Sequence, residues 1–217
     1  MNLNKINLDR VKGILIDLDD TVYNYQKCHD FALDKTYKIA CSLIKKEITK
    51  IHFKRLYRNC RNIVTEKLKG TGSSRSRLLA FQMLLEKVKH NNVIEHSLML
   101  EKNYWDNFIK KMKIDKEMYS FLEKINNLSI PVCVVTDMML EVQIKKIQKL
   151  KIINFVNCIV TSEETGKEKP ASENFELALR KLGLKPSEAI MIGDSKSKDI
   201  NGATKIGIKA YLFQASK

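Results

Sequence analysis

After residue 114 the sequence alternates between segments of helical length and short apolar runs. The apolar runs are rich in branched residues, as buried strands are. We expect strands at 131–135, around 158–160, at 189–192 and near 209–213, and helices at 116–128, 139–150, 172–182 and about 200–205. Strands that are separated by helices pair in parallel through right-handed crossovers. The pattern therefore predicts an α/β fold with a Rossmann-like, doubly wound parallel sheet.

One more strand is expected near the N-terminus, at 11–18, where the run VKGILIDL leads into further carboxylates. From about 26 to 111 the sequence pattern is different: the apolar residues recur at the spacing of amphipathic helices. This helical segment stands between the first strand and the rest of the sheet. The sequence therefore predicts a core domain made of 1–22 and 113–217, with an inserted all-α cap domain at 23–112.

The composition is that of a globular protein, with 44% hydrophobic and 29% charged residues. No apolar run approaches the ~20 residues that span a membrane, and the first residues lack the apolar block of a signal peptide. The five cysteines are scattered without CxxC spacing, which argues against a zinc site or a disulfide framework. We expect a cytoplasmic protein with no membrane partner; the sequence does not indicate its oligomeric state.

The net charge of +14 is concentrated in the helical segment. Residues 23–112 carry 19 Lys and Arg against 8 Asp and Glu, whereas the remainder carries 20 against 17. Such a basic module could attract nucleic acid or a small anionic substrate. A solvated, lysine-rich helical surface would have the same composition.

Aspartates lie at or just past the ends of three predicted strands. Asp17 and Asp19 belong to the end of the first, Asp137 follows 131–135, and Asp194 and Asp199 follow 189–192. Ligands of parallel sheets bind at the carboxyl ends of the strands. Carboxylates that converge there repel one another unless a cation neutralises them. An all-oxygen site of this kind suits Mg²⁺.

Two other groups are expected at the same edge of the sheet. Lys169 follows the third strand of the chain, and Thr136 with the backbone N–H of Asp137 could donate hydrogen bonds to a phosphate oxygen. Taken singly, each has a simpler interpretation, since strand-end aspartates often belong to turns and Thr136 could cap the next helix. Their joint arrangement favours a phosphate-binding site.

The sequence resembles the haloacid dehalogenase superfamily of phosphotransferases. The resemblance rests on four motifs in order, Asp17-Leu18-Asp19-Asp20-Thr21, Thr136-Asp137, Lys169-Pro170, and Gly193-Asp194-Ser195 through Asp199. It covers the core, roughly 10–22 and 113–217. Asp137 replaces the asparagine that often follows the motif threonine, which matters little if the backbone N–H binds the phosphate.

The resemblance implies a role for each motif residue. Asp17 would attack phosphorus and form an aspartyl-phosphate. Asp19 would protonate the leaving oxygen and then deprotonate the hydrolytic water. Thr21 would brace the loop that carries the nucleophile.

The resemblance also implies a magnesium site and a phosphate site. Asp17, the backbone carbonyl of Asp19, and Asp194 would hold the metal. Asp199 would support that site and orient Lys169. The residues that would bind the phosphoryl group are Lys169, Thr136 and Asp137.

We therefore expect a magnesium-dependent phosphatase that hydrolyses a small phosphorylated metabolite, such as a sugar phosphate or a nucleotide-like phosphomonoester. An acidic residue at position 19 favours phosphoryl transfer, since a dehalogenase has no leaving oxygen to protonate. A phosphomutase of the same superfamily would share all four motifs and remains an alternative. A second alternative is a nucleic-acid-binding protein that uses the basic helices, but their aromatics mostly have helix-core spacing, so nucleic acid is the less favoured partner.

The segment 70–77 is the main break in the helical domain and contains that domain's only glycines. Its hydroxyl groups and its two arginines, Arg75 and Arg77, suit contact with an anionic or hydroxyl-rich leaving group. An exposed turn with a serine that caps the next helix would look the same. The hypothesis assigns substrate selectivity to this segment.

Overall fold

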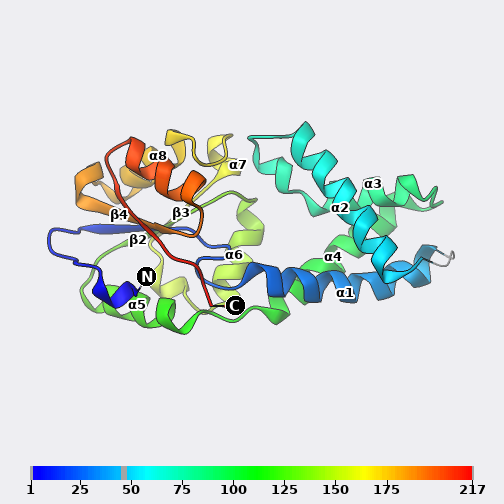
Figure 1. Cartoon of the computed structure of the whole chain (residues 1–217), viewed down its shortest axis with the longest axis horizontal. Coiled ribbons are helices and arrows are strands. Elements are labelled where there is room, and N and C mark those ends of the chain that lie inside the picture. The colour runs from blue at the N-terminus through cyan, green and yellow to red at the C-terminus, as the bar shows by residue number, and fades with distance from the viewer. Residues whose placement is uncertain (1, 45–47, 217) are drawn as a thin grey trace. The chain divides into compact units, whose positions relative to one another are not determined.

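A computed structural model describes residues 2–44 and 48–216. The chain forms two compact units (Figure 1). The first comprises Met1–Tyr25, Gly70–Gly72 and Met112–Lys217, and the second comprises Gln26–Lys69 and Ser73–Lys111. Residues 70–72 thus belong with the first unit, although they lie inside the segment 23–112 that the sequence assigns to the helical domain.

The first unit contains a five-stranded sheet in the order β3-β2-β1-β4-β5. Every neighbouring pair is parallel. The strands are β1 (Gly13–Ile16), β2 (Val132–Thr136), β3 (Cys158–Thr161), β4 (Ala189–Gly193) and β5 (Lys209–Leu212). The predicted α/β class and its parallel sheet are confirmed, with the first strand shorter than the apolar run that predicts it.

Helices cover both faces of the sheet, with α8 on one side and α5 on the other in Figure 1. The helices of this unit are α5 (Lys116–Asn127), α6 (Leu140–Lys149), α7 (Ser162–Thr165), α8 (Ser172–Leu182) and α9 (Asn201–Lys205). Successive side chains of a strand point to opposite faces, and both faces are covered, so the central strands are apolar except for Thr136 at the end of β2. Leu15, Met191 and Val135 form one core with Phe175 of α8 and Ala203 of α9.

Local signals set several helix ends. The side chain of Asp115 accepts a hydrogen bond from the N–H of Met118 and so caps α5. At the C-terminal end of α8, Gly183 has a φ of 67°, the left-handed conformation that glycine adopts without a steric penalty. The glycine cap ends α8 shortly before β4.

The second unit is helical, as its spacing of apolar residues predicts. Its elements are α1 (Tyr25–Ile44), α2 (Lys50–Lys67), α3 (Arg77–Lys87) and α4 (Val93–Lys111). Aromatic side chains fill its centre, where Tyr57, Phe81 and Tyr104 are buried and in ring contact. Ser76 caps α3 by accepting a hydrogen bond from the N–H of Leu79.

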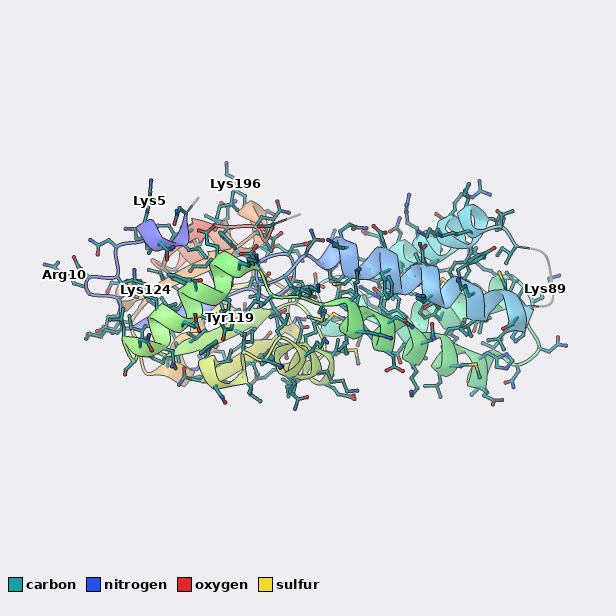
Figure 2. All side chains as sticks on the ribbon, turned by 90° about the horizontal axis from the view of Figure 1, so that it is seen from below. Lys5, Arg10, Lys89, Tyr119, Lys124 and Lys196 are labelled. Atoms are coloured by element: carbon teal, nitrogen blue, oxygen red, sulfur yellow. The ribbon has the colours of Figure 1, made fainter. Side chains whose placement is uncertain are left out.

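Lysines project from the surfaces of both units. Lys5, Lys124 and Lys196 extend from the first unit and Lys89 from the second (Figure 2). Among the described residues, no helix combines the length and apolarity needed to cross a membrane.

Candidate active site

The site is built around Asp17, which directly follows β1. Its N–H donates to the carbonyl of Ile192 on β4 over 2.9 Å, so the sheet pairing continues through this residue. The side chain is buried, with 6% of the residue exposed. One carboxylate oxygen lies 2.6 Å from Lys169 Nζ, and the other accepts a hydrogen bond from Thr21 Oγ1 over 3.1 Å. Both oxygens are therefore held at the carboxyl end of the central strand.

Lys169 joins three elements of the first unit. Its Nζ lies 2.6 Å from Asp17 Oδ1, 2.6 Å from Asp199 Oδ1 and 2.9 Å from the carbonyl oxygen of Val135. The residue is almost completely buried. Burial alone would lower the pKa of Lys169, but the negative charges of Asp17 and Asp199 outweigh it and raise the pKa above its ordinary value. The ammonium group therefore stays charged.

Asp199 lies in a single π-helical turn after β4, Lys196–Ile200, labelled η5. Its second carboxylate oxygen accepts a hydrogen bond from the N–H of Ser195 over 3.0 Å. Gly193 is packed against this side chain, because a β-carbon at position 193 would lie 2.4 Å from Asp199 Oδ2. The tight turn thus fixes Asp199, and Asp199 in turn holds Lys169.

Three carboxylates converge at this edge of the sheet. Oxygens of Asp17, Asp194 and Asp199 lie within 4.8 Å of one another. Burial raises the pKa of Asp17 well above its ordinary value, against the charge of Lys169 and with further repulsion from Asp199. Burial and the charges of Asp199 and Asp20 raise the pKa of Asp194 to about 6.

The donor set of this cluster fits a hard divalent cation. All of its groups are carboxylate oxygens, which Mg²⁺ prefers, and the ammonium of Lys169 contacts two of the three, Asp17 and Asp199. Burial is the main cause of the raised pKa values of Asp17 and Asp194, and the repulsion between neighbouring carboxylates, which a bound cation would relieve, adds to it.

Asp19 is held by a separate set of side chains. One of its oxygens lies 2.6 Å from Lys146 Nζ and accepts a hydrogen bond from the hydroxyl of Tyr23; the other lies 3.4 Å from Gln143 Nε2. Burial acts to raise the pKa of Asp19, but the charge of Lys146 and these hydrogen bonds lower it below its ordinary value. Asp19 is thus held as a carboxylate in this state of the protein.

Thr136 and Asp137 end β2 beside the nucleophile loop. Thr136 is buried, and its Oγ1 accepts a hydrogen bond from Gln143 Nε2. Asp137 accepts from the N–H of Lys169 over 2.8 Å and from Lys198 Nζ over 2.8 Å. The carboxylate of Asp137 is therefore used to position the chain around Lys169.

The structure brings together the core residues singled out from the sequence. All of them lie at the carboxyl edge of the sheet or in the loops that follow it: Asp17, Asp19, Thr21, Thr136, Asp137, Lys169, Asp194 and Asp199. Their chemical roles stay predictions.

Arg75 and Arg77 belong to the helical unit. Arg77 is buried, donates to the carbonyl of Arg75 over 2.8 Å, and places its guanidinium 5.7 Å from the ring centre of Tyr104 and 5.6 Å from that of Trp105. Arg75 is half-buried at the end of a short 3₁₀ turn, Gly72–Arg75. The two arginines thus have different surroundings, and their contact with a substrate stays a prediction.

Sequence reasoning missed Lys146 and Gln143, both on α6. Positions 143, 146, 147 and 150 are all buried and recur at helical spacing, so they form the inner stripe of this segment. Two polar residues in that stripe, beside Ile147 and Leu150, are the signal that could have identified them.

Comparisons with known proteins agree with the geometry. The sequence model described as haloacid dehalogenase-like hydrolase matches residues 14–213. A ribulose-1,5-bisphosphate 5-phosphatase of Halopiger xanaduensis is 30% identical, with 94% of this chain and 85% of that protein covered. A glyceraldehyde 3-phosphate phosphatase of Methanopyrus kandleri is 29% identical, with 95% and 85% covered.

Solved structures show the same fold. A HAD-hydrolase of Bacillus subtilis bound to magnesium superposes with a TM-score of 0.71 at 19% identity, covering 94% of this chain and 88% of that one. A 2-haloacid dehalogenase of Pseudomonas syringae gives 0.72 at 18% identity, covering 93% and 86%. The sequence matches confirm the family resemblance and the phosphatase class that the sequence predicts, and the solved structures show the fold. The chain belongs to the haloacid dehalogenase-like hydrolase family.

Proposed function

We propose that this protein is a magnesium-dependent phosphatase that hydrolyses a small sugar phosphate through an aspartyl-phosphate on Asp17. The observation that carries the proposal is the fixed carboxylate of Asp17, held by Lys169 and Thr21 at the end of β1. A second carboxylate, Asp19, lies two residues further on. This pair supplies a nucleophile and a proton-transfer group at one site.

In the first half of the reaction an oxygen of Asp17 attacks phosphorus. The bond between phosphorus and the leaving oxygen breaks, and the leaving oxygen takes a proton from Asp19. Asp19 is ionised beside Lys146 in the protein alone, but the negative charge of a bound phosphate would raise its pKa and favour the protonated form.

In the second half a water molecule attacks the phosphorus of the aspartyl-phosphate. Asp19 takes a proton from this water, and the bond between phosphorus and the oxygen of Asp17 breaks. Inorganic phosphate leaves, and Asp17 returns as a carboxylate. Lys169 and Thr136, with the backbone N–H of Asp137, hold the phosphoryl oxygens throughout.

Asp17, Asp194 and the backbone carbonyl of Asp19 would hold Mg²⁺, with Asp199 in support. When bound, the ion would neutralise charge on the phosphoryl group and on the carboxylates. Asp199 also orients Lys169, with which it makes a 2.6 Å contact.

We assign the substrate to the short-chain sugar phosphates. The relatives that match most of the chain are named for ribulose-1,5-bisphosphate and glyceraldehyde 3-phosphate. Both are alkyl phosphates, whose poor leaving groups need the proton that Asp19 would supply. The four motifs act on the phosphoryl group alone, so we assign the choice of leaving group to the helical unit.

A phosphate-release assay over a panel of metabolites tests the proposal. The panel contains glyceraldehyde 3-phosphate, ribulose-1,5-bisphosphate and nucleoside monophosphates, each with Mg²⁺ and with a chelator. We expect release from at least one sugar phosphate, only with Mg²⁺, and none by Asp17→Asn. Release from no sugar phosphate, or isomerisation of the substrate without release, would contradict the proposal.

A further inference from the structure

The inner stripe of α6 places two polar side chains beside the acid–base candidate. Lys146 and Gln143 each have no solvent-exposed surface, whereas the side chain of Asp19 is 26% exposed. Burying an ammonium group is costly unless it is paired. The 2.6 Å contact with Asp19 Oδ1 supplies that partner.

The ammonium group of Lys146 also lies near two aromatic rings. Its Nζ lies 5.8 Å from the ring centre of Tyr23 and 5.9 Å from that of Tyr25. Rings at this distance attract a cation. Tyr23 also donates its hydroxyl hydrogen to the same carboxylate of Asp19. The ammonium of Lys146 is thus placed by two elements, α6 and the segment that follows the nucleophile loop.

Gln143 restrains the other oxygen of Asp19. Its Nε2 lies 3.4 Å from Asp19 Oδ2 and also donates to Thr136 Oγ1 at the end of β2. Both carboxylate oxygens of Asp19 therefore contact α6, and Gln143 links Asp19 to the residue expected to bind a phosphoryl oxygen.

The two carboxylates that would carry the chemistry, Asp17 and Asp19, contact different buried lysines. Lys169 contacts Asp17 and Lys146 contacts Asp19. Of these two lysines, Lys169 belongs to the motifs of the family resemblance. Lys146 comes from a helix that the motifs do not include.

We propose that Lys146 is a positioning residue, which orients the carboxylate of Asp19 toward the leaving oxygen, with Gln143 fixing the second carboxylate oxygen. The proposal rests on the proposed function, because it needs Asp19 to transfer the proton. A carboxylate on a loop has several rotamers, and contacts from three side chains select one of them. The competing interpretation is that Lys146 only stabilises the fold.

The test uses Lys146→Met, which keeps the length of the side chain and removes its charge. We compare kcat/KM for an alkyl phosphate that the wild type hydrolyses with kcat/KM for 2,4-dinitrophenyl phosphate, whose leaving group needs no proton. This parameter reports the steps up to departure of the leaving group. We expect a loss of about a hundredfold with the alkyl phosphate and little change with the aryl phosphate. Lys146→Arg should recover part of the loss.

A double-mutant cycle then asks whether Lys146 acts through Asp19. In an Asp19→Asn background, Lys146→Met should cause no further loss with the alkyl phosphate, because the group that it positions is already absent. Lys145→Met is the matched control, since Lys145 is exposed on the same helix and pairs with Glu141; its kinetics should equal the wild type. If Lys146→Met does not fold, Gln143→Met gives the same comparison, with a smaller selective loss expected.

The proposal is wrong if Lys146→Met slows both substrates equally, slows neither, or adds its full effect to Asp19→Asn. Failure of the proposed function itself would be seen in the Asp19→Asn variant. If Asp19→Asn itself shows no dependence on the leaving group, Asp19 is not the proton donor, and the role of Lys146 is refuted with it.

Discussion

Gly193 and Asp199 are packed so closely that a β-carbon on residue 193 would lie 2.4 Å from Asp199 Oδ2 and 2.5 Å from its Cγ. The carboxylate of Asp199 cannot move away easily, because its Oδ1 contacts Lys169 and its Oδ2 accepts a hydrogen bond from the N–H of Ser195. The glycine of the last motif therefore makes room for the side chain that holds Lys169.

Gly193→Ala should accordingly displace Asp199 and, with it, Lys169. We expect kcat to fall by about a hundredfold, the effect of moving a positioning group by about 1 Å. The control is Gly183→Ala, at a residue with φ of +67° and no neighbour within 4 Å of the added carbon. That change should lower stability through backbone strain but leave kcat unchanged. Similar kcat losses in both variants would show that stability, and not the position of Asp199, is responsible.

Magnesium affinity should depend on pH through Asp194. Its pKa of about 6 lies above the ordinary value of 3.8, so the folded protein binds a proton there that the unfolded chain has already lost. Without metal, the stability contributed by this group is present below pH 3.8 and is lost as pH rises through about 6. Mg²⁺ must displace that proton, so its affinity should increase over the same range.

Thermal unfolding with and without Mg²⁺, at pH values on either side of 6, measures this linkage. Mg²⁺ should raise the midpoint more at the higher pH. Asp194→Asn should remove most of the response, whereas Asp9→Asn, at an exposed residue, should retain it. Ca²⁺ should not support turnover, because it prefers more ligands and looser geometry. An equal response to Mg²⁺ in wild type and Asp194→Asn would contradict the metal site.

His29 should make the helical unit sensitive to acid. Burial, with the nearby charge of Arg77, lowers the pKa of His29 from 6.5 to about 4, and its Nδ1 lies 2.7 Å from the hydroxyl of Tyr104. Between these pH values the unfolded chain binds a proton that the folded protein does not. The free energy of unfolding should therefore fall as pH falls from 6.5 toward 4, by at most about 1.4 kcal/mol per pH unit.

Urea unfolding followed by tryptophan fluorescence can measure this, since Trp105 of the helical unit is the only tryptophan of the chain. His29→Gln should reduce the slope of stability against pH. His52→Gln, at an exposed histidine on α2, should retain the slope. An unchanged slope in His29→Gln would assign the acid sensitivity to other groups.

Arg75, which precedes α3, and Arg77, its first residue, should contribute differently to stability. Arg77→Ala removes a buried guanidinium packed on Tyr104 and Trp105, and we expect a loss of about 1–3 kcal/mol. Arg75→Ala should cost less, because Arg75 is only half-buried. If the loop contacts the leaving group, either change raises KM for the native substrate about tenfold and leaves a small aryl phosphate unaffected. Equal KM values for wild type and Arg75→Ala would show that the loop is a structural turn that does not contact the substrate.

Much of the core was predictable because its signals are local. The apolar run before Asp17 and the run before Thr136 each predict a strand, and parallel pairing places their ends at one edge of the sheet. The topology thus places the ends of β1 and β2 together. Lys169 lies in the segment between α7 and α8, so its 2.6 Å contact with Asp17 depends on the path of that segment as well.

Lys146 was not predictable in the same way. Lys145, Lys146 and Lys149 all lie on α6, and composition does not distinguish the buried lysine from its exposed neighbours. The helical spacing places position 146 on the inner stripe of α6, but the orientation of the helix on the sheet decides that this lysine faces Asp19. The burial of Arg77 was missed for a similar reason, because it depends on tertiary packing against Tyr104 and Trp105.

The most direct measurement is chemical trapping of the intermediate on Asp17. Enzyme with Mg²⁺ and excess sugar phosphate is quenched during turnover and treated with borohydride, which reduces an acyl phosphate to an alcohol. Peptide mass spectrometry should then find homoserine at position 17, and only when both substrate and Mg²⁺ were present. Asp17→Asn should give neither homoserine nor phosphate release. Efficient phosphate release without homoserine at position 17, or homoserine at another aspartate, would contradict the assignment of Asp17 as the nucleophile.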